Sequence, residues 1–588
     1  MPAFPIQRPR ALPVAALRPA WLLLCCWLAS TAVADTLKVE ITGVKGELQR
    51  NLVEHLAAVQ GDELEKLSSG RIRAMHRRAP AALAEALQAL GYYEAQIEPS
   101  LTHSGSNWQA HYAVTRGEPV RIGAVRIDLT GEAAQDEAFA DRLQKFPLAV
   151  GDRLVHARWE DGKRALERQL ADRGYFDARI VKAEVRVQRA RRSARALLAI
   201  DSGPRYRFGE VLWPRTRLAP DFLSRYVSIE PGAPFSAREM LDFQARLTDS
   251  NYFGSVLVEP RTDLAEDERV PLEVELEMRP ARRYSVGAGF GTDTGPRARA
   301  AWQRPWVNER GHRAEVDLRL SQVQSTLSGL YSMPRASRWT DSIDLTTELS
   351  NEDTDAKKAL TLRVGAAHLT TRFGWREAVG LEYEVESYDV AESGEIAGLL
   401  VPSARWTRTW TDDPIYTRNG LRLGFGIRGA HSALLSSTSF AQIRMDAKYV
   451  RALGGTRLIL RSEFGAVAAE DFDKLPASER FFAGGDTSLR GFDYQSLGPR
   501  TDKGKVEGGQ YLMLGSVEVE QKIVGNWSAA AFTDVGNALN DLSDPIACGV
   551  GVGVRWLSPV GLVRVDLANG IPSADSPWRI HVVVGPDL

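Results

Sequence analysis

Cysteine, long apolar runs and an excess of one charge are all scarce in this chain. Three of its 588 residues are cysteines, namely Cys25, Cys26 and Cys548. Lys and Arg together number 74 and Asp and Glu number 75, a balance that argues against a general nucleic-acid binder. Charged residues make up 25% of the chain, so it is not a bundle of hydrophobic helices. Its length predicts several domains rather than one.

One continuous apolar run, residues 21–28, lies near the start of the chain, after a basic segment made by Arg8, Arg10 and Arg18. An Ala-Val-Ala sequence follows at residues 32–34. This order is typical of a secretory signal peptide, and the run is too short for a membrane anchor, which needs about 20 apolar residues. We therefore expect residues 1–34 to be removed on export. The exported chain would keep Cys548 alone and form no internal disulfide.

A helical stretch followed by an aromatic pair recurs three times in the first half of the chain. The three copies are Gly91, Tyr92, Tyr93; Gly174, Tyr175, Phe176; and Asn251, Tyr252, Phe253. Before each copy, apolar residues recur at the four-residue spacing of one helix face. Gly or Asn at the next position fits a left-handed helix C-cap. With the strand-like segments around them, the two full units of this repeat each predict the order strand, helix, helix, strand, strand.

The repeats divide the first half of the chain into three expected domains, residues 35–117, 118–203 and 204–279. One helix stripe and one cap would fit any small α+β domain, but three copies in register argue for a shared role. The copies resemble POTRA domains, the polypeptide-transport modules that precede certain outer-membrane barrels. The resemblance implies an open strand edge that receives another chain by β-augmentation.

The second half of the chain changes to apolar–polar alternation with a period of two. No later stretch is long and apolar enough for a membrane helix, so an exported chain of this kind is either soluble or a closed barrel. The alternating runs often reach about ten residues, the length that a tilted strand needs to cross a bilayer, and short turns alternate with long polar loops such as residues 470–508. A soluble sandwich explains the alternation but neither of these features. We therefore expect residues 280–588 to form an antiparallel transmembrane β-barrel.

About sixteen strands are expected in this barrel, and an even number lets the first and last strands meet as neighbours. The expected strand centres are Val286, Ala300, Asp317, Gly329, Thr346, Val364, Glu382, Ala404, Gly424, Ile443, Leu460, Gly515, Ala531, Gly551, Val565 and Val582.

A loop arginine and a strand aspartate are expected to meet inside the barrel. The loop at residues 480–494 contains Arg490, Gly491 and Phe492. A later strand carries Phe532, Asp534 and Gly536 on one face. If that face points into the lumen, an inward loop could pair its guanidinium with Asp534 by charge-assisted hydrogen bonds. The triplet alone fits a solvated loop equally well.

Four motifs in one order make the interpretation more specific. They are Arg-Gly-Phe at residues 490–492, Ser-Val-Glu at 516–518, Phe-x-Asp-x-Gly at 532–536, and Gly-Val-Gly-Val-Arg-Trp-x-Ser-Pro-Val-Gly at 551–561. This order resembles the superfamily of BamA, TamA and the two-partner-secretion transporters. The resemblance implies that Arg490 pairs with Asp534, that Gly491 allows close approach and that Phe492 packs on the barrel wall. Glu518 matches an acidic position of the family.

Domain number separates the branches of this superfamily. BamA-like chains usually have five POTRA domains and two-partner-secretion transporters two, whereas three repeats resemble the TamA branch. That resemblance implies an outer-membrane protein with periplasmic POTRA domains that assembles or inserts other outer-membrane proteins, autotransporters among them. It also implies contact with the lipid bilayer and with a TamB-like partner anchored in the inner membrane. Envelope lipid transport with the same partner is an alternative.

The first and last strands of the expected barrel look weak. Strand one, residues 283–290, contains two glycines, and strand sixteen, residues 579–585, is followed by Pro586, which cannot donate a ladder hydrogen bond. A seam between them could open sideways and offer its edges to a client strand. The seam would be lined by Tyr284, Gly287, Gly289, Ile580, Val582 and Val584. The alternative is that the two glycines simply fit a crowded lumen wall.

Three other function classes compete with this one. A two-partner-type secretion pore would export a soluble partner through its lumen. A plain diffusion porin does not explain three POTRA-like repeats. An enzyme is not expected, because the chain has no His-Glu-x-x-His, no Gly-x-Ser-x-Gly and no phosphate-binding Gly-rich loop before a helix. No cofactor, metal ion or nucleic-acid partner is predicted.

Overall fold

The computed structural model describes residues 36–60, 68–335, 338–390, 393–413, 416–558, 561–571 and 578–584. The expected signal peptide and Pro586 lie outside these residues. The chain divides into two compact units, Met1–Ala171 with Tyr175–Arg205 and Asp172–Gly174 with Tyr206–Leu588, and each is described by itself. Within the described residues, every helix is too short or too polar to cross a membrane.

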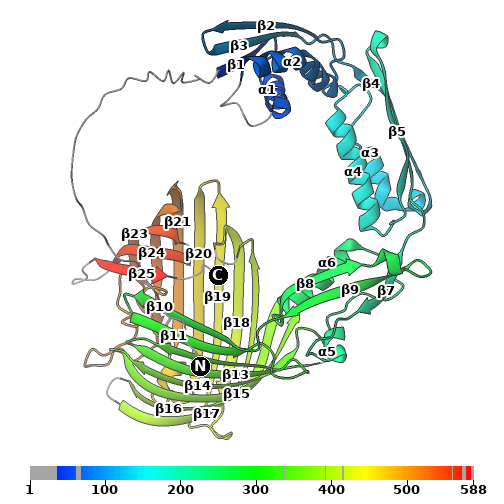
Figure 1. Cartoon of the computed structure of the whole chain (residues 1–588). Coiled ribbons are helices and arrows are strands. Elements are labelled where there is room, and N and C mark those ends of the chain that lie inside the picture. The colour runs from blue at the N-terminus through cyan, green and yellow to red at the C-terminus, as the bar shows by residue number, and fades with distance from the viewer. Residues whose placement is uncertain are drawn as a thin grey trace, which may run out of the picture. The chain divides into compact units, whose positions relative to one another are not determined.

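The first unit contains two small α+β domains (Figure 1). The elements of the first domain are β1 (Thr36–Thr42), α1 (Glu47–Gln60), α2 (Ser69–Ala89), β2 (Gln96–Ser104) and β3 (Asn107–Thr115). Those of the second are β4 (Arg121–Thr130), α3 (Ala140–Gln144), α4 (His156–Asp172), β5 (Arg179–Gln188) and β6 (Ser193–Asp201). In each sheet the last strand lies in the middle, parallel to the first strand and antiparallel to the second.

The second unit begins with a third domain of the same order. Its elements are β7 (Arg207–Leu212), α5 (Pro220–Ser224), α6 (Ala237–Asp249), β8 (Phe253–Pro260) and β9 (Arg269–Met278), and β9 is the middle strand. The predicted order of strand, helix, helix, strand, strand therefore occurs three times. The predicted left-handed caps fit the backbone, with φ of +90° at Gly91, +88° at Gly174 and +63° at Asn251.

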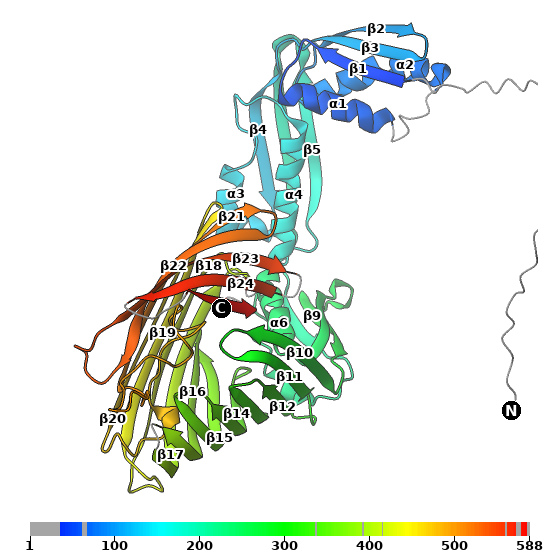
Figure 2. The same ribbon diagram turned by 90° about the vertical axis from the view of Figure 1, so that its left-hand side faces the viewer.

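The rest of the second unit is one sheet of sixteen strands that follow each other in chain order. The strands are β10 (Arg283–Gly291), β11 (Gly295–Arg304), β12 (Arg313–Leu320), β13 (Gln324–Pro334), β14 (Ser342–Asp353), β15 (Lys357–Arg372), β16 (Trp375–Val390), β17 (Ser393–Thr411), β18 (Asn419–Ala430), β19 (Phe440–Leu453), β20 (Thr456–Ala469), β21 (Tyr511–Val524), β22 (Trp527–Leu539), β23 (Ala547–Ser558), β24 (Gly561–Ile571) and β25 (Arg579–Val584). All sixteen predicted centres lie inside these strands, so the predicted strand number is confirmed. The sheet curls into a barrel that brings β25 beside β10 (Figures 1 and 2).

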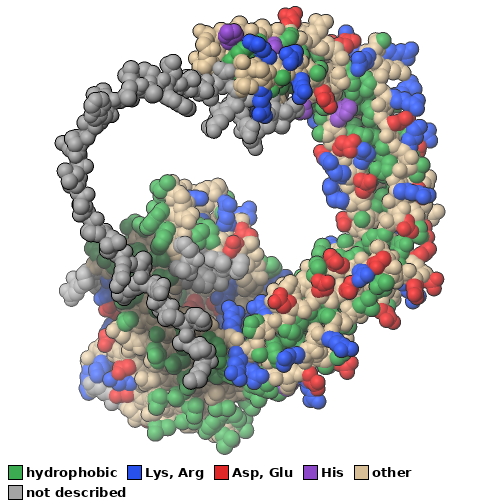
Figure 3. Space-filling view, viewed as in Figure 1, with side chains coloured by type: hydrophobic (Ala, Val, Ile, Leu, Met, Phe, Trp, Pro, Cys, Tyr) green, Lys and Arg blue, Asp and Glu red, His purple; other side chains and the backbone are tan. Residues whose placement is uncertain are grey.

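The two faces of the barrel sheet differ in the way a membrane barrel requires. On β22, Phe532 and Asp534 point inward and are buried, whereas the next residue, Val535, points outward and is 44% exposed. Leu345, Leu349 and many other large apolar side chains of the barrel strands are exposed in the same way. Figure 3 shows hydrophobic side chains gathered over the outer wall. Such an outward apolar band is the surface that contacts lipid.

One end of the barrel rests on the third small domain. The Ala219 N–H donates to the Glu309 carbonyl in the turn between β11 and β12 (2.9 Å), and the Tyr252 hydroxyl donates to the Gly311 carbonyl (2.6 Å). The Arg313 guanidinium in turn donates to the Tyr252 hydroxyl (2.9 Å). The short turn at residues 308–311 therefore faces the third small domain, and the long loop after β20 lies at the opposite end of the barrel.

Candidate functional site

The loop between β20 and β21 folds into the barrel lumen. Phe481 and Gly509 exchange two backbone hydrogen bonds (3.0 and 2.7 Å), which turn the loop back on itself. Its apolar residues Leu475, Phe481 and Ala483 pack against wall residues such as Val467. Arg490, deep in the loop, is only 5% exposed. The alternative of a solvated loop is therefore wrong.

Arg490 holds the loop to the barrel wall through three carboxylates. Its Nε and Nη2 donate to the two oxygens of Asp534 (2.7 and 2.9 Å), and its backbone N–H donates to the same side chain (3.1 Å). Its Nη1 donates to Glu518 (2.7 Å) and Asp566 (3.1 Å). The guanidinium carbon lies 3.3 Å from the centre of the Phe532 ring. A planar, five-donor guanidinium suits such bidentate recognition.

A second guanidinium completes the charge network. Arg555 on β23 donates to Glu518 (2.6 Å), Glu520 (3.2 Å) and Asp566 (2.5 Å). Arg457 on β20 pairs with Glu520 at 2.6 Å. Acids and arginines thus alternate across the wall, and each buried charge has an opposite charge beside it. Burial lowers the pKa of Arg490, but the hydrogen bonds and charges of the carboxylates outweigh it and leave that pKa above its ordinary value.

Small residues on the last strands make room for the loop. A Cβ added at Gly549 of β23 would lie 1.9 Å from the Arg490 carbonyl oxygen, and one at Gly570 of β24 would lie 2.6 Å from the Phe492 ring. Gly491 has φ +95°, and its own Cβ would lie 2.7 Å from the backbone of Asn569. The loop and the wall therefore approach at backbone distance, which glycine alone permits.

The start of the loop has a separate anchor on β16. Ser478 donates its hydroxyl to Glu384 (2.7 Å) and its backbone N–H to Glu386 (3.2 Å). Glu479 pairs with Arg428 of β18 at 3.0 Å. Burial, which outweighs the nearby arginine, raises the pKa of Glu479 to about 7. The loop is therefore fixed on two sides of the lumen.

The structure brings together most of the residues that the sequence singled out for this lock. Gly536 is the exception, since an added Cβ there would meet Met513 of β21 at 2.0 Å and not the loop. Sequence reasoning missed Arg555, Glu520 and Asp566. Arg555 lies inside the motif at residues 551–561, and Glu518 and Glu520 are two apart on one strand, so they share a face. Arg555 is the shared partner of Glu518, Glu520 and Asp566. Their meeting depends on the register of the four strands β21 to β24, which the sequence does not reveal.

The seam between β10 and β25 is weakly bonded. Within the described residues the two strands form no ladder, and the Val582 N–H donates to the Thr292 hydroxyl (3.1 Å). In the described part of the last hairpin, β25 pairs with β24 over the six residues from Arg579 to Val584. The exposed fractions of Tyr284, Ile580 and Val584 are 68%, 59% and 47%.

The two glycines of β10, Gly287 and Gly289, do not lie in a crowded part of the barrel wall. A Cβ added at Gly289 would meet nothing within 4 Å, and one at Gly287 would only touch the Arg299 Cβ at 4.0 Å. Crowding therefore does not explain them, in contrast to Gly549 and Gly570. What remains is their effect on the strand itself, which glycine weakens.

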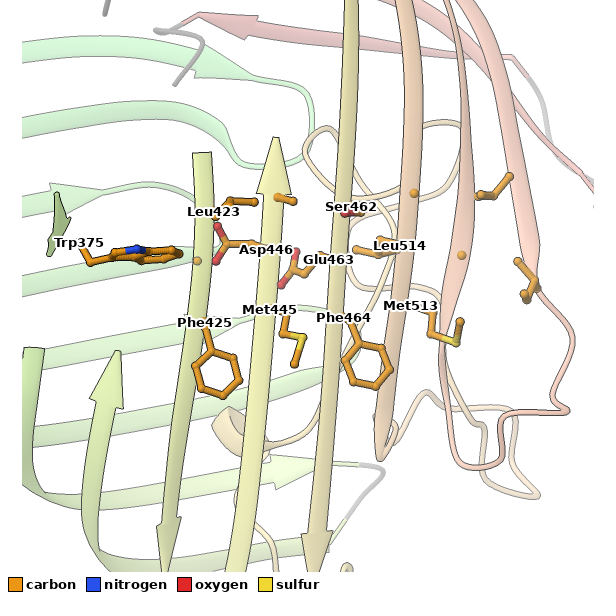
Figure 4. Close-up of a pocket in the computed structure, with 16 residues that line it drawn as sticks. Trp375, Leu423, Phe425, Met445, Asp446, Ser462, Glu463, Phe464, Met513 and Leu514 are labelled. Carbon is orange, nitrogen blue, oxygen red and sulfur yellow. The ribbon is translucent and has the colours of Figure 1, made fainter. Parts of the chain in front are cut away.

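A groove on the outer wall is apolar and faces away from the lumen. Figure 4 shows Phe425, Met445, Phe464 and Met513 side by side on β18–β21. These four residues are register partners of one another and lie on the same side of the sheet as outward Val535. The groove is thus part of the lipid-facing band rather than a polar ligand site.

The described residues contain one group that has the composition of a metal site, namely Asp293, Asp486 and His581, whose potential ligand atoms lie within 4.8 Å of one another. The Gly491 N–H donates to His581 Nε2 (2.9 Å), so the neutral ring carries its proton on Nδ1. A metal ion on Nδ1 would displace that proton and leave no proton on either ring nitrogen while this bond holds. The group therefore fits a hydrogen-bond cluster better than a metal centre.

The repeated tyrosines differ in what they contact. Tyr92 accepts a hydrogen bond from Arg153 of the second domain (3.0 Å), as Tyr252 does from Arg313 of the barrel. Tyr175 donates to Asp136 within its own domain (3.2 Å), and the Arg205 guanidinium lies over its ring, 5.9 Å from the ring centre. Each copy thus has an arginine of the next part of the chain against its tyrosine.

Comparison with known families gives three matches. Residues 282–585 match the Omp85 superfamily domain, residues 38–116 match the POTRA domain described as TamA domain 1, and residues 120–197 match a POTRA domain described as a surface antigen variable number repeat. The Omp85 match alone covers half of the chain.

Similar proteins agree with these matches. The outer membrane protein assembly factor BamA of Neorickettsia risticii (strain Illinois) is 22% identical over 398 residues, 60% of this chain and 51% of the relative. That of Nitratidesulfovibrio vulgaris is 22% identical over 373 residues, 59% of this chain and 46% of the relative. The chain spans about half the length of the curated relatives it matches.

One solved structure supports the fold. The crystal structure of BamA from Haemophilus ducreyi lacking POTRA domains 1–3 has a TM-score of 0.66 and 15% identity, and the match covers 79% of this chain and 99% of that chain. Fold, charge network and family matches lead to one conclusion: this protein belongs to the Omp85 superfamily of outer-membrane β-barrel proteins with periplasmic POTRA domains.

Proposed function

We propose that this protein inserts or assembles other outer-membrane proteins, autotransporters among them, together with a TamB-like partner anchored in the inner membrane. A client strand pairs with the free edge of β10 at the seam. The observation that carries the proposal is the missing ladder between β10 and β25 in the described residues. An unpaired strand edge presents a row of N–H and C=O groups that another strand can bind.

The loop that folds into the lumen supports this function over a secretion pore. The loop after β20 is anchored to β16 and β18 at its start and to β21, β22 and β24 around Arg490. A soluble partner could pass only if these buried ion pairs were broken, and removing one partner of a buried pair is costly. The seam, in contrast, has no ladder between β10 and β25 in the part of the chain that the structure describes.

The small domains offer edges for the periplasmic partner. In each three-stranded sheet the middle strand is covered on both sides, and the outer two strands each keep one edge free within that sheet. β-augmentation at such an edge uses main-chain hydrogen bonds and needs little sequence specificity. We take residues 35–117, 118–203, 204–279 and 280–588 as the POTRA and barrel boundaries.

A disulfide lock across the seam tests the proposed function. The Val582–Thr292 contact, continued in antiparallel register, places Val584 opposite Phe290. In a Cys548→Ser background, Phe290→Cys with Val584→Cys should abolish client assembly when oxidised and restore it when reduced. The matched control is Leu349→Cys with Leu362→Cys, an outward pair on the bonded strands β14 and β15. Unchanged client assembly with the seam locked shut would rule the proposal out.

A further inference from the structure

The long loop joins both sides of the seam through one side chain. Asp486 accepts a hydrogen bond from the Thr292 hydroxyl, just after β10 (3.0 Å), and its backbone N–H donates to Asp293 in the β10–β11 turn (2.5 Å). On the other side its carboxylate pairs with His581 Nδ1 on β25 (2.5 Å). Asp486 is 8% exposed and His581 is 3% exposed.

Other loop residues hold β25 next to this cluster. The Gly491 N–H donates to His581 Nε2 (2.9 Å), and Asp493 pairs with Arg579. With both ring nitrogens of His581 engaged, the side chain keeps one tautomer, with Nδ1 as the donor to Asp486. The loop thus supplies several polar contacts to β25. In the described residues β25 has no ladder with β10, and the direct polar contact between the two sides is the Val582–Thr292 hydrogen bond.

We propose that Asp486 is a latch that holds β10 and β25 together through the loop, so that the seam opens only when Asp486 releases His581 or Thr292. The proposal rests on the proposed seam function and adds its regulation. Arg490 lies four residues further along the same loop and fixes it to the wall. Movement of the loop therefore frees both strand ends at once, and a loop held by Arg490 keeps the seam shut.

Two carboxyl groups, those of Asp486 and Asp293, lie close together in this latch. The Asp486 Oδ2 atom is buried without a hydrogen-bond partner, and Asp293 is close enough to interact with it. Burial, together with the Asp486 charge, raises the pKa of Asp293 to about 6. Tyr494 and His581 also face this carboxylate, and Arg297 lies nearby on β11. Because the closed state binds this proton more tightly than a solvated carboxyl does, its stability is highest at low pH and falls as the pH rises towards about 6.

The test measures seam closure with no client or partner present. The full-length protein with Phe290→Cys, Val584→Cys and Cys548→Ser is placed in lipid vesicles, and the disulfide yield is followed under mild oxidant. Asp486→Ala should lower the rate of crosslinking about tenfold or more, as expected for loss of hydrogen bonds to a charged group. Asp486→Asn keeps an acceptor oxygen and should retain most of the rate. Asp471→Ala, an exposed residue of the same loop, should leave it unchanged.

A pH profile separates a latch from a general packing role. Between pH 5 and 7.5 the parent rate, normalised to the Leu349–Leu362 control pair, should fall, and Asp293→Asn should flatten that profile. If Asp486→Ala does not yield a folded barrel, His581→Phe removes the β25 partner of Asp486, leaves the Val582–Thr292 hydrogen bond in place and carries the same test. A crosslinking rate equal to the parent in the folded variant overturns the latch. Because no client is present, that result leaves the proposed function standing, and failed client assembly leaves this result unaffected.

Discussion

The Arg490 side chain fills a position that no other residue type suits. Its guanidinium forks onto Asp534, reaches Glu518 and Asp566, and lies over the Phe532 ring. A lysine would bring one point charge and lose the bidentate geometry. The cost of burying these carboxylates is offset only while a cation stays among them.

Removal of this cation is expected to loosen the whole barrel. Arg490→Ala leaves buried carboxylates without their shared partner and should destabilise the folded barrel by about 3 kcal/mol or more. The measurement is the temperature at which the unboiled protein loses its compact migration in a gel. Arg500→Ala is the matched control, because Arg500 is an exposed arginine of the same loop that contacts only loop carbonyls in the described structure. Equal melting of the two variants would contradict the lock.

The motif at residues 490–492 and Asp534 could be predicted as a pair from the sequence, because the pairing is carried by a known motif order. Arg555, Asp566 and His581 could not. Each lies on a different strand, and their meeting depends on the register of β21 to β25 and on the path of a long loop. Local periodicity places a residue on the inner or outer face of its strand but not at a height in the barrel.

At the scale of the elements, strand positions were the most predictable feature. Apolar–polar alternation over about ten residues is a strong signal, so the sixteen expected centres all lie in strands. Strand ends were less predictable. β17 runs from Ser393 to Thr411, well beyond the membrane-spanning length, because hairpins continue past the bilayer. A weak seam was predicted from the two glycines of β10 and from Pro586, and Pro586 lies outside the described residues; within those residues no ladder joins β10 to β25.

Glycines in β10 are expected to set the strength of the seam. Gly287→Val and Gly289→Val place β-branched side chains in open space, so the barrel should fold and β10 should become a better strand. We expect a higher rate of Phe290–Val584 crosslinking and slower client assembly. The control is Gly426→Ala in β18, where an added Cβ meets only ordinary contacts at 3.9 Å or more. Faster client assembly in the valine variants would contradict this role.

At the scale of the whole molecule, the three small domains and the barrel present different surfaces in different compartments. The small domains present free strand edges in the periplasm, and the barrel presents an apolar wall and a weak seam in the membrane. The repeat of Gly or Asn with tyrosine was visible in the sequence. The sequence did not show that Tyr92 and Tyr252 contact the following part of the chain. The repeat carries no information on their partners, Arg153 and Arg313.

Deletion of the first domain tests the identity of the partner and whether the partner needs this domain for binding. A tagged full chain should recover a very large, β-rich, inner-membrane-anchored protein from envelope membranes, and a chain without residues 35–117 should lose it. The retained Omp85 barrel is checked by its compact migration in a gel. Recovery of small periplasmic lipoproteins would place the protein nearer the BamA branch, and recovery of one secreted adhesin-like protein would favour a secretion pore.

Direct capture of a client strand on β10 tests the central claim. The full-length protein carries Ser285→Cys in the Cys548→Ser background, and a client carries one cysteine in its terminal strand. The control places the cysteine at Leu349 in β14, which is bonded on both sides. The account predicts a disulfide adduct at Ser285 that forms during assembly, moves in register as the client cysteine is moved, and is absent at Leu349. Completed client assembly with no adduct along β10, or equal adducts at Leu349, would contradict it.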